Sequence, residues 1–268
     1  MKKKQLLLKQ MKPIQILFYA LCCFSIFLSC ETNERDFYQI KIYNLETDQQ
    51  ERRMDHYLQN AYIPALNRIG MKNIGVFKPI EKSDTESKLI YIFIPFKSLL
   101  QFEQLEENLR SDKEYLEDGK DYITATHDNA PYVRIENIIL RSFQSMTQYG
   151  IPTHKSPPSE RIYELRSYQA ATEKLYEKKV EMFNAGGESK IFIDLGFQPI
   201  FFGEVISGSS MPNLMYLSTF ENKASQKKHW DAFRNSPDWH TLKSDEQYNN
   251  TVSKSEKFYL YPTDYSQL

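Results

Sequence analysis

The chain has 268 residues, 26% of them charged, and a formal net charge of −1. It contains no glycine-rich phosphate loop and neither a G-x-S-x-G nor an HExxH motif, which leaves nucleotide cofactors, serine hydrolases of that type and zinc proteases unsupported. Its five histidines show no ligand spacing, so we expect no metal site and no cofactor.

The N-terminus resembles a bacterial lipoprotein signal peptide. Five lysines precede an apolar run over residues 14–28, which is shorter than the ~20 residues that a membrane span needs. The run ends in "FLSC", where Cys30 follows a small residue as in a lipobox. The resemblance implies that residues 1–29 are removed and that a lipid is attached to Cys30. An uncleaved anchor and an ordinary signal peptide cleaved nearby are the alternatives, and Met11 is an alternative start.

Maturation at Cys30 would leave a polar tether over residues 30–36 and a body without internal cysteine, which excludes disulfides and cysteine-based metal or redox chemistry. The removed segment contains five lysines and no acidic residue, so 29 basic and 35 acidic side chains would remain, a net charge of −6. We therefore expect no nucleic-acid binding. We expect the protein to be held on a membrane of the bacterial cell envelope, facing the periplasm or the cell surface.

The remainder of the chain repeats itself at a distance of about 125 residues. The stretch "FYQIKIY" is echoed by "RIYELRSY", and later landmarks keep nearly the same offset. Gly70 matches Gly196 at 126 residues, and Tyr91 matches Tyr216 at 125. A nearly constant offset over successive landmarks indicates a duplicated domain. We expect one domain at 37–145 and the other at 160–263, with a proline-rich linker at 146–159 between them.

Both copies predict the same order of elements, βαββαβ, which is the ferredoxin-like unit. Alternation at period two marks the strands, and apolar residues at steps of three and four mark the helices. The expected strands are 37–45, 73–81, 88–95 and 132–140, then 161–168, 198–206, 213–220 and 256–262, and the expected helices are 54–69, 97–109, 175–183 and 222–234. Each sheet would leave one face uncovered, so we expect an α+β fold in which the two sheets face each other as one barrel within a monomer.

The second copy contains four distinctive motifs, in the order "IYELRSY", "DLGFQPIFF", "YLSTFEN" and "RNSPDWHTL". With these motifs it resembles the NIPSNAP family of the dimeric α/β-barrel superfamily. The resemblance covers residues 161–262 well and 37–142 more faintly. It implies the fold but little chemistry, because the family's members have no agreed reaction. The family often shows His-x-Trp on the third strand, where this chain has Tyr216 and Ser218, so a role that needs this histidine is not carried over.

The first strand of each copy predicts a candidate site. We expect its more apolar side to pack on the helices and its polar side to line the barrel interior, together with a tyrosine of the seventh strand. The residues expected to line this interior cavity are Gln39, Lys41, Tyr43, Glu164, Arg166, Tyr168 and Tyr216. Buried charges need partners, so these residues either form a structural salt bridge inside a filled barrel or hold a polar ligand.

The segment "KKHWDAF" and the following "PDWH" suggest a second candidate. His229 and His240 could act as a general base or a haem ligand beside an aromatic wall. The structural interpretation has Trp230 and Trp239 as packing anchors and both histidines on the surface. Nothing in the sequence decides between these two interpretations.

Two hypotheses for the function follow. The first is a lipid-anchored protein that binds a small molecule or a partner protein in the cell envelope, since no catalytic constellation accompanies the fold. The alternative is a cofactor-free or haem-dependent oxygenase or isomerase that acts in the barrel interior. They are distinguished by whether Glu164, Arg166, Tyr168 and Tyr216 converge on an empty pocket of at least ~300 Å³.

Overall fold

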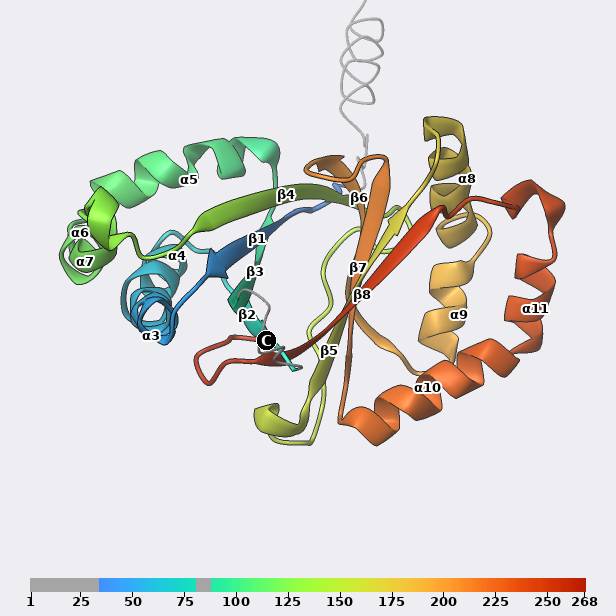
Figure 1. The fold of residues 1–268 in the computed structure, drawn as a ribbon. Coiled ribbons are helices and arrows are strands. Elements are labelled where there is room, and N and C mark those ends of the chain that lie inside the picture. The colour runs from blue at the N-terminus through green and yellow to red at the C-terminus, as the bar shows by residue number, and fades with distance from the viewer. Residues whose placement is uncertain (1–33, 81–87) are drawn as a thin grey trace, which may run out of the picture. The chain divides into compact units, whose positions relative to one another are not determined.

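The computed structural model describes residues 34–80 and 88–268, and Arg35–Leu268 form one compact unit. Figure 1 shows the first four strands and their helices on one side of this unit and the last four strands and their helices on the other. In the first half the elements are β1 (Phe37–Leu45), α3 (Asp48–Tyr57), a π-helical turn (Leu58–Tyr62), α4 (Ile63–Arg68), β2 (Gly75–Pro79), β3 (Lys88–Phe96), α5 (Leu99–Ser111), α6 (Lys113–Asp118), α7 (Lys120–Ile123), a 3₁₀ turn (His127–Asn129) and β4 (Arg134–Ser142).

The second half repeats this order with small changes. Its elements are a 3₁₀ turn (Pro158–Glu160), β5 (Ile162–Gln169), α8 (Glu173–Phe183), α9 (Glu188–Asp194), β6 (Gln198–Ser207), β7 (Asn213–Phe220), α10 (Lys223–Asn235), α11 (Pro237–Lys243), a 3₁₀ turn (Glu246–Tyr248) and β8 (Lys254–Pro262). The first helix of this half is interrupted after Phe183, where Gly187 adopts φ +86° before α9 begins. A positive φ of this kind favours glycine, as the Gly186-Gly187 pair indicates.

Side-chain caps fix where the main helices begin. Thr47, Ser98, Thr172, Asn222 and Ser236 each accept a hydrogen bond from the backbone N–H three residues later. Each cap satisfies a backbone donor that the first helical turn leaves free, which contributes about 1 kcal/mol. The first four caps therefore set the point at which the chain turns from a strand into its covering helix, and Ser236 marks the change from α10 to α11.

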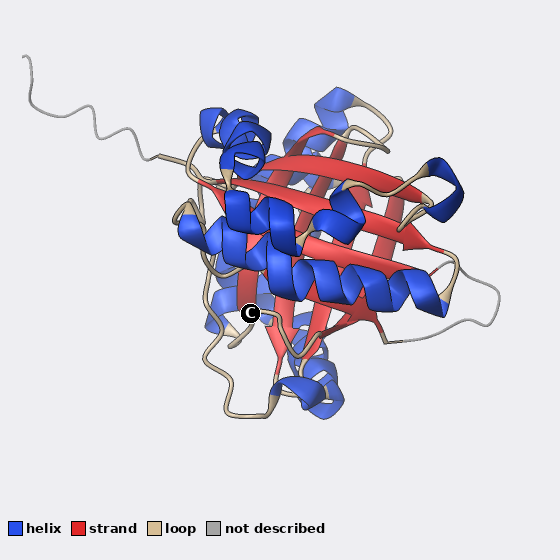
Figure 2. Cartoon of the chain, turned by 90° about the vertical axis from the view of Figure 1, so that its left-hand side faces the viewer, coloured by secondary structure: helices blue, strands red, loops and turns tan. Residues whose placement is uncertain are grey.

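All eight strands form one closed antiparallel barrel in the order β1-β3-β2-β8-β5-β7-β6-β4. Moving four places along this order takes β1 to β5, β3 to β7, β2 to β6 and β8 to β4, so an approximate twofold axis runs along the barrel axis. The helices cover the outside, and Figure 2 shows those of the first half in front of the strands. The α+β fold with two ferredoxin-like units closed into one barrel is confirmed.

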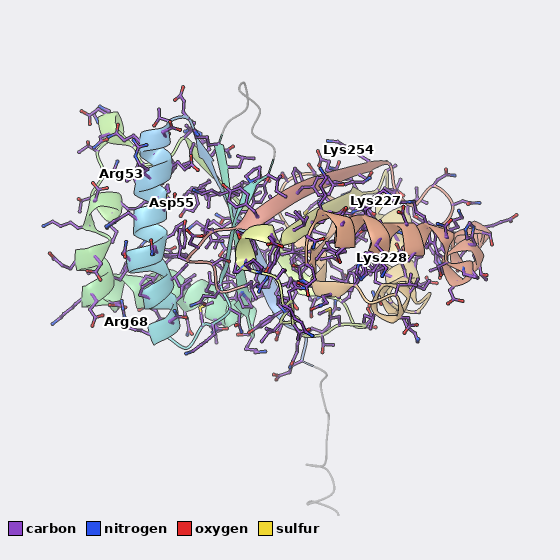
Figure 3. The ribbon with its side chains drawn as sticks, turned by 90° about the horizontal axis from the view of Figure 1, so that it is seen from below. Arg53, Asp55, Arg68, Lys227, Lys228 and Lys254 are labelled. Atoms are coloured by element: carbon purple, nitrogen blue, oxygen red, sulfur yellow. The ribbon has the colours of Figure 1, made fainter. Side chains whose placement is uncertain are left out.

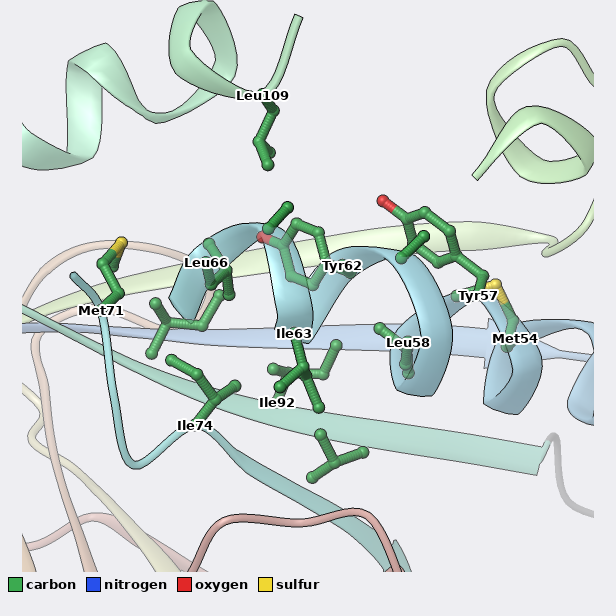
Figure 4. Packing of buried hydrophobic residues seen from close by; sticks show 14 of the residues in the cluster. Met54, Tyr57, Leu58, Tyr62, Ile63, Leu66, Met71, Ile74, Ile92 and Leu109 are labelled. Carbon is green, nitrogen blue, oxygen red and sulfur yellow. The ribbon is translucent and has the colours of Figure 1, made fainter. Parts of the chain in front are cut away.

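Three apolar clusters hold the unit together. One fills the barrel, and one lies between the sheet and the helices in each half. Figure 4 shows the first-half cluster, in which Ile63 of α4 lies close to Ile92 of β3. Both faces of the central strands are therefore buried, one against the barrel interior and one against helices.

The strand register corrects one landmark of the repeat. Tyr91 pairs with Ile42 on β1, whereas its equivalent on β7, which pairs with Ser167 on β5, is Met215. The true offset of these strands is thus 124 residues, and Tyr216 corresponds to Ile92. A slip of one residue moves a side chain to the opposite face of a strand. Tyr91 accordingly belongs to the barrel cluster, and Tyr216 belongs to the cluster under the second-half helices.

Candidate functional site

The first strands of both halves turn their polar residues toward the helices. Tyr38 and Ile40 of β1, and Tyr163 and Leu165 of β5, belong to the cluster inside the barrel. Because successive side chains of a strand point to opposite faces, the residues between them face the helix layers. The residues on this outer face, with the one on β7, are the predicted Gln39, Lys41, Tyr43, Glu164, Arg166, Tyr168 and Tyr216.

The expectation that these seven residues line an interior cavity is therefore wrong. The closed barrel takes the more apolar strand face, because its interior is filled by aromatic rings such as Phe93 and Phe201, whose centroids lie 5.4 Å apart. A close-packed interior without polar partners does not tolerate charges. The helix layer does, because helix side chains supply hydrogen-bond donors and acceptors to the strand beneath.

Glu164 and Arg166 form a buried ion pair beneath α10. Arg166 Nε donates to Glu164 Oε1 at 2.7 Å, and Arg166 Nη2 lies 2.5 Å from the same oxygen. The other carboxylate oxygen accepts from Trp230 Nε1 at 2.6 Å and from Gln226 Nε2 at 2.8 Å. The Arg166 guanidinium also stacks on Trp230, with 3.6 Å from Cζ to the ring centroid. Both charges are thus compensated by fixed partners.

Two tyrosines continue this network. Tyr168 Oη lies 3.1 Å from Arg166 Nη1 and 2.9 Å from Tyr216 Oη. A second buried pair, Lys179 Nζ to Glu188 Oε2 at 2.7 Å, packs alongside, and its lysine lies over the Tyr168 ring at 5.7 Å. Burial raises the pKa of Glu188 although Lys179 opposes the shift. Glu164, Arg166, Tyr168 and Tyr216, whose arrangement was to distinguish a binding protein from an enzyme, therefore bond to one another and do not surround an empty pocket. Their hydrogen bonds form a structural network.

The histidines near the tryptophans serve packing and the surface. His229 is half-buried, with its ring 5.3 Å from Phe197 and 5.7 Å from Phe220, and His240 is exposed. Trp230 is buried and packs on the aromatic cluster, as the structural interpretation expects. Figure 3 shows Lys227 and Lys228 on α10, and both are exposed. Within 34–80 and 88–268, no group of three or more His, Cys, Asp or Glu residues is arranged to hold a metal ion.

One end of the barrel is closed by the segment between β4 and β5 and by the C-terminus. Tyr149 packs on Phe93 at 6.0 Å between ring centroids, and Leu268 is buried in the barrel cluster. His154 Nε2 lies 3.1 Å from Thr219 Oγ1, with 2% of its side chain exposed. Burial lowers the pKa of His154, although nearby Glu221 opposes the shift. These side chains therefore pack over this end of the barrel.

The opposite end of the barrel holds a pocket of about 270 Å³, here called the mouth pocket. Its floor is apolar and its rim carries carboxylates, hydroxyls and amides. The lining residues are Ile42, Asn44, Leu89, Tyr91, Glu136, Ile138, Leu165, Ser167, Ser209, Ser210, Asn213, Met215, Glu256 and Phe258. None of the seven predicted cavity residues is among them.

Both halves contribute equivalent residues to the mouth pocket. Glu136 of β4 pairs with Ile42 of β1, and Glu256 of β8 pairs with Ser167 of β5. The two carboxylates are therefore related by the approximate twofold axis. Sequence reasoning missed both, although a signal exists: each glutamate lies two residues before an inward-facing Ile138 or Phe258 on the last strand of its copy.

The second half of the barrel resembles a known protein family. Residues 163–267 match the NIPSNAP family model. This segment is similar to a NIPSNAP domain. The match agrees with the motifs of the second copy, and it provides β5 to β8 of the barrel. No curated protein matches the sequence.

Solved structures resemble the chain in its fold. A candidate monooxygenase from Lactobacillus acidophilus is 13% identical, with a TM-score of 0.55 over 85% of this chain and 94% of that one. A candidate monooxygenase from Fusobacterium nucleatum is 8% identical, with a TM-score of 0.54 over 85% and 92%. A NIPSNAP family protein from Agrobacterium tumefaciens is 18% identical and aligns over 45% of this chain and 98% of its own, with a TM-score of 0.36. At these identities the two candidate monooxygenases share the barrel architecture with this chain.

Both halves of the barrel present no membrane-spanning element in the part that the structure describes. No helix there combines the length and the apolar character that a bilayer crossing requires. The predicted lipidation site, Cys30, lies outside the described residues.

Proposed function

We propose that the chain is a lipid-anchored protein of the bacterial cell envelope whose barrel binds a small molecule in the mouth pocket. The observation that carries this proposal is the pocket itself, an apolar floor with a polar rim built from both halves. Ligand sites are typically concave, mostly apolar and supplied with a few convergent polar groups, and barrel mouths are common places for them. At about 270 Å³ the pocket lies just below the usual range for such sites, about 300–1,000 Å³, which favours a compact ligand.

Ligand retention tests this proposal. The full chain would be isolated from its native membrane in an uncharged detergent and studied by native mass spectrometry. A reproducible additional mass is expected, together with a monomeric protein, because one chain supplies the whole barrel.

A pocket-filling variant makes the test specific. Ile42→Trp would place a large ring in the mouth pocket and should abolish the additional mass. The matched control is Ile193→Trp on α9, where the side chain is 51% exposed, outside the barrel. A mass retained by both variants would show that the ligand lies elsewhere. A bare wild-type monomer would favour a protein partner instead.

Membrane attachment requires its own test. Cys30→Ser should move the protein from the membrane fraction to the soluble fraction, because several acyl chains contribute about 0.8 kcal/mol for each buried CH₂ group. Cys23→Ser, within the apolar run, is the matched control and should leave fractionation unchanged. Equal fractionation of both variants would refute lipidation at Cys30.

An oxygenase or isomerase acting in the barrel interior has less support. The two candidate monooxygenases with a similar fold would suggest it, but their sequences share only 8% and 13% identity with this chain. The residues on which the alternative depended form a closed network under the helices. Most of the barrel interior is occupied by packed side chains. Binding in the mouth pocket is therefore the function that the geometry supports best.

A further inference from the structure

The charge of the mouth pocket indicates which class of ligand it takes; this inference rests on the proposed binding function. Two of the lining side chains, Glu136 and Glu256, are acidic, and none is a lysine, arginine or histidine. Glu256 accepts from Gln169 Nε2 at 2.9 Å and pairs with Lys254 Nζ at 2.8 Å. Lys254 lies at the start of β8 (Figure 3), with 60% of its side chain exposed, so solvent screens this pair strongly.

The carboxylate of Glu136 has even less compensation. It accepts a hydrogen bond from Ser209 Oγ, and no cationic side chain of the described residues lies within ion-pair distance of it. Two carboxylates related by the approximate twofold axis therefore line one cavity, and one exposed lysine pairs with one of them. A site of this kind attracts positive charge.

A second observation points independently to a ligand. Tyr91 lines the mouth pocket and is 4% exposed, yet its hydroxyl makes no hydrogen bond to any described residue. Burial raises the pKa of this phenol, and the neighbouring Glu136 and Glu256 raise it further, so the hydroxyl keeps its proton. The amide of Asn213, 3% exposed, accepts from Ser167 Oγ and donates to no described group. Both side chains are more than nine-tenths buried and line the pocket, so their unpaired donors are available to a ligand there.

The remaining walls suit the body of such a ligand. Tyr91 and Phe258, whose ring centroids lie 5.9 Å apart, line the pocket together with Glu136 and Glu256. Aromatic faces attract organic cations. Ile138, Leu165 and Met215 form the apolar floor beneath them.

We infer that the mouth pocket binds a small organic cation, an ammonium group on a compact apolar body. The ammonium group lies between Glu136 and Glu256, and the apolar body packs on the aromatic and aliphatic walls. Tyr91 and Asn213 donate hydrogen bonds to a hydroxyl or carbonyl oxygen of the ligand. The acidic rim makes a carboxylate-bearing or phosphate-bearing ligand of the same size unfavourable.

Three probes of similar size and different charge test this inference. Phenethylammonium, 2-phenylethanol and phenylacetate would be titrated into the full chain, freed of any retained ligand, by isothermal calorimetry. We expect phenethylammonium to bind at least tenfold more tightly than the alcohol and phenylacetate not to bind, because a charge-assisted hydrogen bond contributes about 1.5–3 kcal/mol and 1.4 kcal/mol is tenfold.

Matched glutamate variants locate the effect. Glu136→Gln and Glu256→Gln should each weaken phenethylammonium binding about tenfold and leave 2-phenylethanol binding unchanged. Glu103→Gln, an exposed position on α5, changes net charge by the same amount and should leave all three affinities unchanged. Circular dichroism confirms that each variant is folded.

The possible failures have different meanings. If 2-phenylethanol or phenylacetate binds as tightly as phenethylammonium, and Ile42→Trp abolishes that binding, the cation inference is overturned while the proposed binding function stands. If Glu103→Gln weakens binding as much as the two pocket variants do, the effect is one of net charge and the site is not the mouth pocket. If no probe binds and no mass is retained from the cell, both the inference and the proposed function fall.

Discussion

The two halves place different chemistry at the same positions of their first strands. Glu164, Arg166 and Tyr168 of β5 correspond to Gln39, Lys41 and Tyr43 of β1, because Tyr38 and Tyr163 occupy equivalent places in the barrel. In the second half the cation has a carboxylate beside it, held in turn by helix side chains. In the first half the carboxylate is replaced by an amide, and Gln39 Nε2 donates to Asn137 Oδ1 at 2.7 Å.

Lys41 illustrates what the missing carboxylate changes. Its Nζ lies 5.3 Å and 5.4 Å from the ring centroids of Tyr43 and Tyr62, and no carboxylate of the described residues is within ion-pair distance. Burial lowers the pKa of Lys41, and the more distant Glu106 only partly opposes the shift. A lysine can meet burial by releasing its proton, whereas an arginine stays charged at every relevant pH. The half that carries arginine therefore also carries the full set of partners.

The helices that cover the two halves also differ in the side chains that they contribute to the layer above the sheet. Under the second-half helices, Trp230 and Gln226 donate to Glu164. Under the first-half helices, tyrosines bond to one another, with Tyr57 Oη 2.8 Å from Tyr115 Oη and Tyr43 Oη 3.1 Å from Tyr122 Oη. The two halves thus share the barrel, while the layer between sheet and helix is a charged network in the second half and a tyrosine cluster in the first.

The largest effect is expected from removing the Glu164 carboxylate, whose place in the first half is taken by the amide of Gln39. Glu164→Gln leaves Arg166 buried without a counter-charge and should lower the free energy of unfolding by about 3–5 kcal/mol. Chemical denaturation of purified variants measures this loss. The matched variant is Gln39→Ala on β1, for which a loss of about 1 kcal/mol is expected because only a neutral hydrogen bond disappears. Equal losses would show that the charged pair contributes nothing particular to the second half.

A smaller effect should follow from the helix side of the same network. Trp230→Phe keeps an aromatic ring against the cluster but removes one of the two donors to the outer carboxylate oxygen of Glu164, and should cost about 1.5–3 kcal/mol, the contribution of a hydrogen bond to a charged group. Trp239→Phe is the control, since its ring packs 4.6 Å from Phe233 and its indole N–H donates to no described residue. Comparable destabilisation of the two variants would indicate lost packing area in place of a lost hydrogen bond.

The fold was accessible from sequence because its signals are local and repeated. Steps of three and four, such as Met54, Leu58, Ala61 and Ala65, predicted the first helix, and all four residues are buried. Period-two alternation in "FYQIKIY" and "IYELRSY" predicted β1 and β5 within one residue. Caps and turns then determined where these elements end, and the repeat determined that the same unit occurs twice.

The candidate site was less accessible, because alternation reveals two strand faces without saying which face meets the barrel. Both faces are buried in this fold, so polarity does not mark the solvent side. Glu164 and Arg166 are tolerated under helices only because Trp230 and Gln226, more than 60 residues away in sequence, meet them there. The mouth pocket is likewise formed by strand ends that only the closed barrel brings together.

The smallest effect is expected at Lys41, whose contribution to stability should depend on pH in a way that the permanently charged Arg166 does not. Lys41→Met removes a charge that has no counter-ion, and replacing a buried charge by an apolar side chain of similar size is often neutral or stabilising, so we expect a change within about 1 kcal/mol at neutral pH. The folded-state pKa of Lys41 lies below its ordinary value of 10.5, so between these two values the unfolded chain binds the additional proton. Stability of the wild type should therefore rise, relative to Lys41→Met, as the pH increases through this window. Denaturation of both proteins from neutral pH toward 10.5 measures the difference, and a constant difference would mean that Lys41 is as well solvated as a surface lysine.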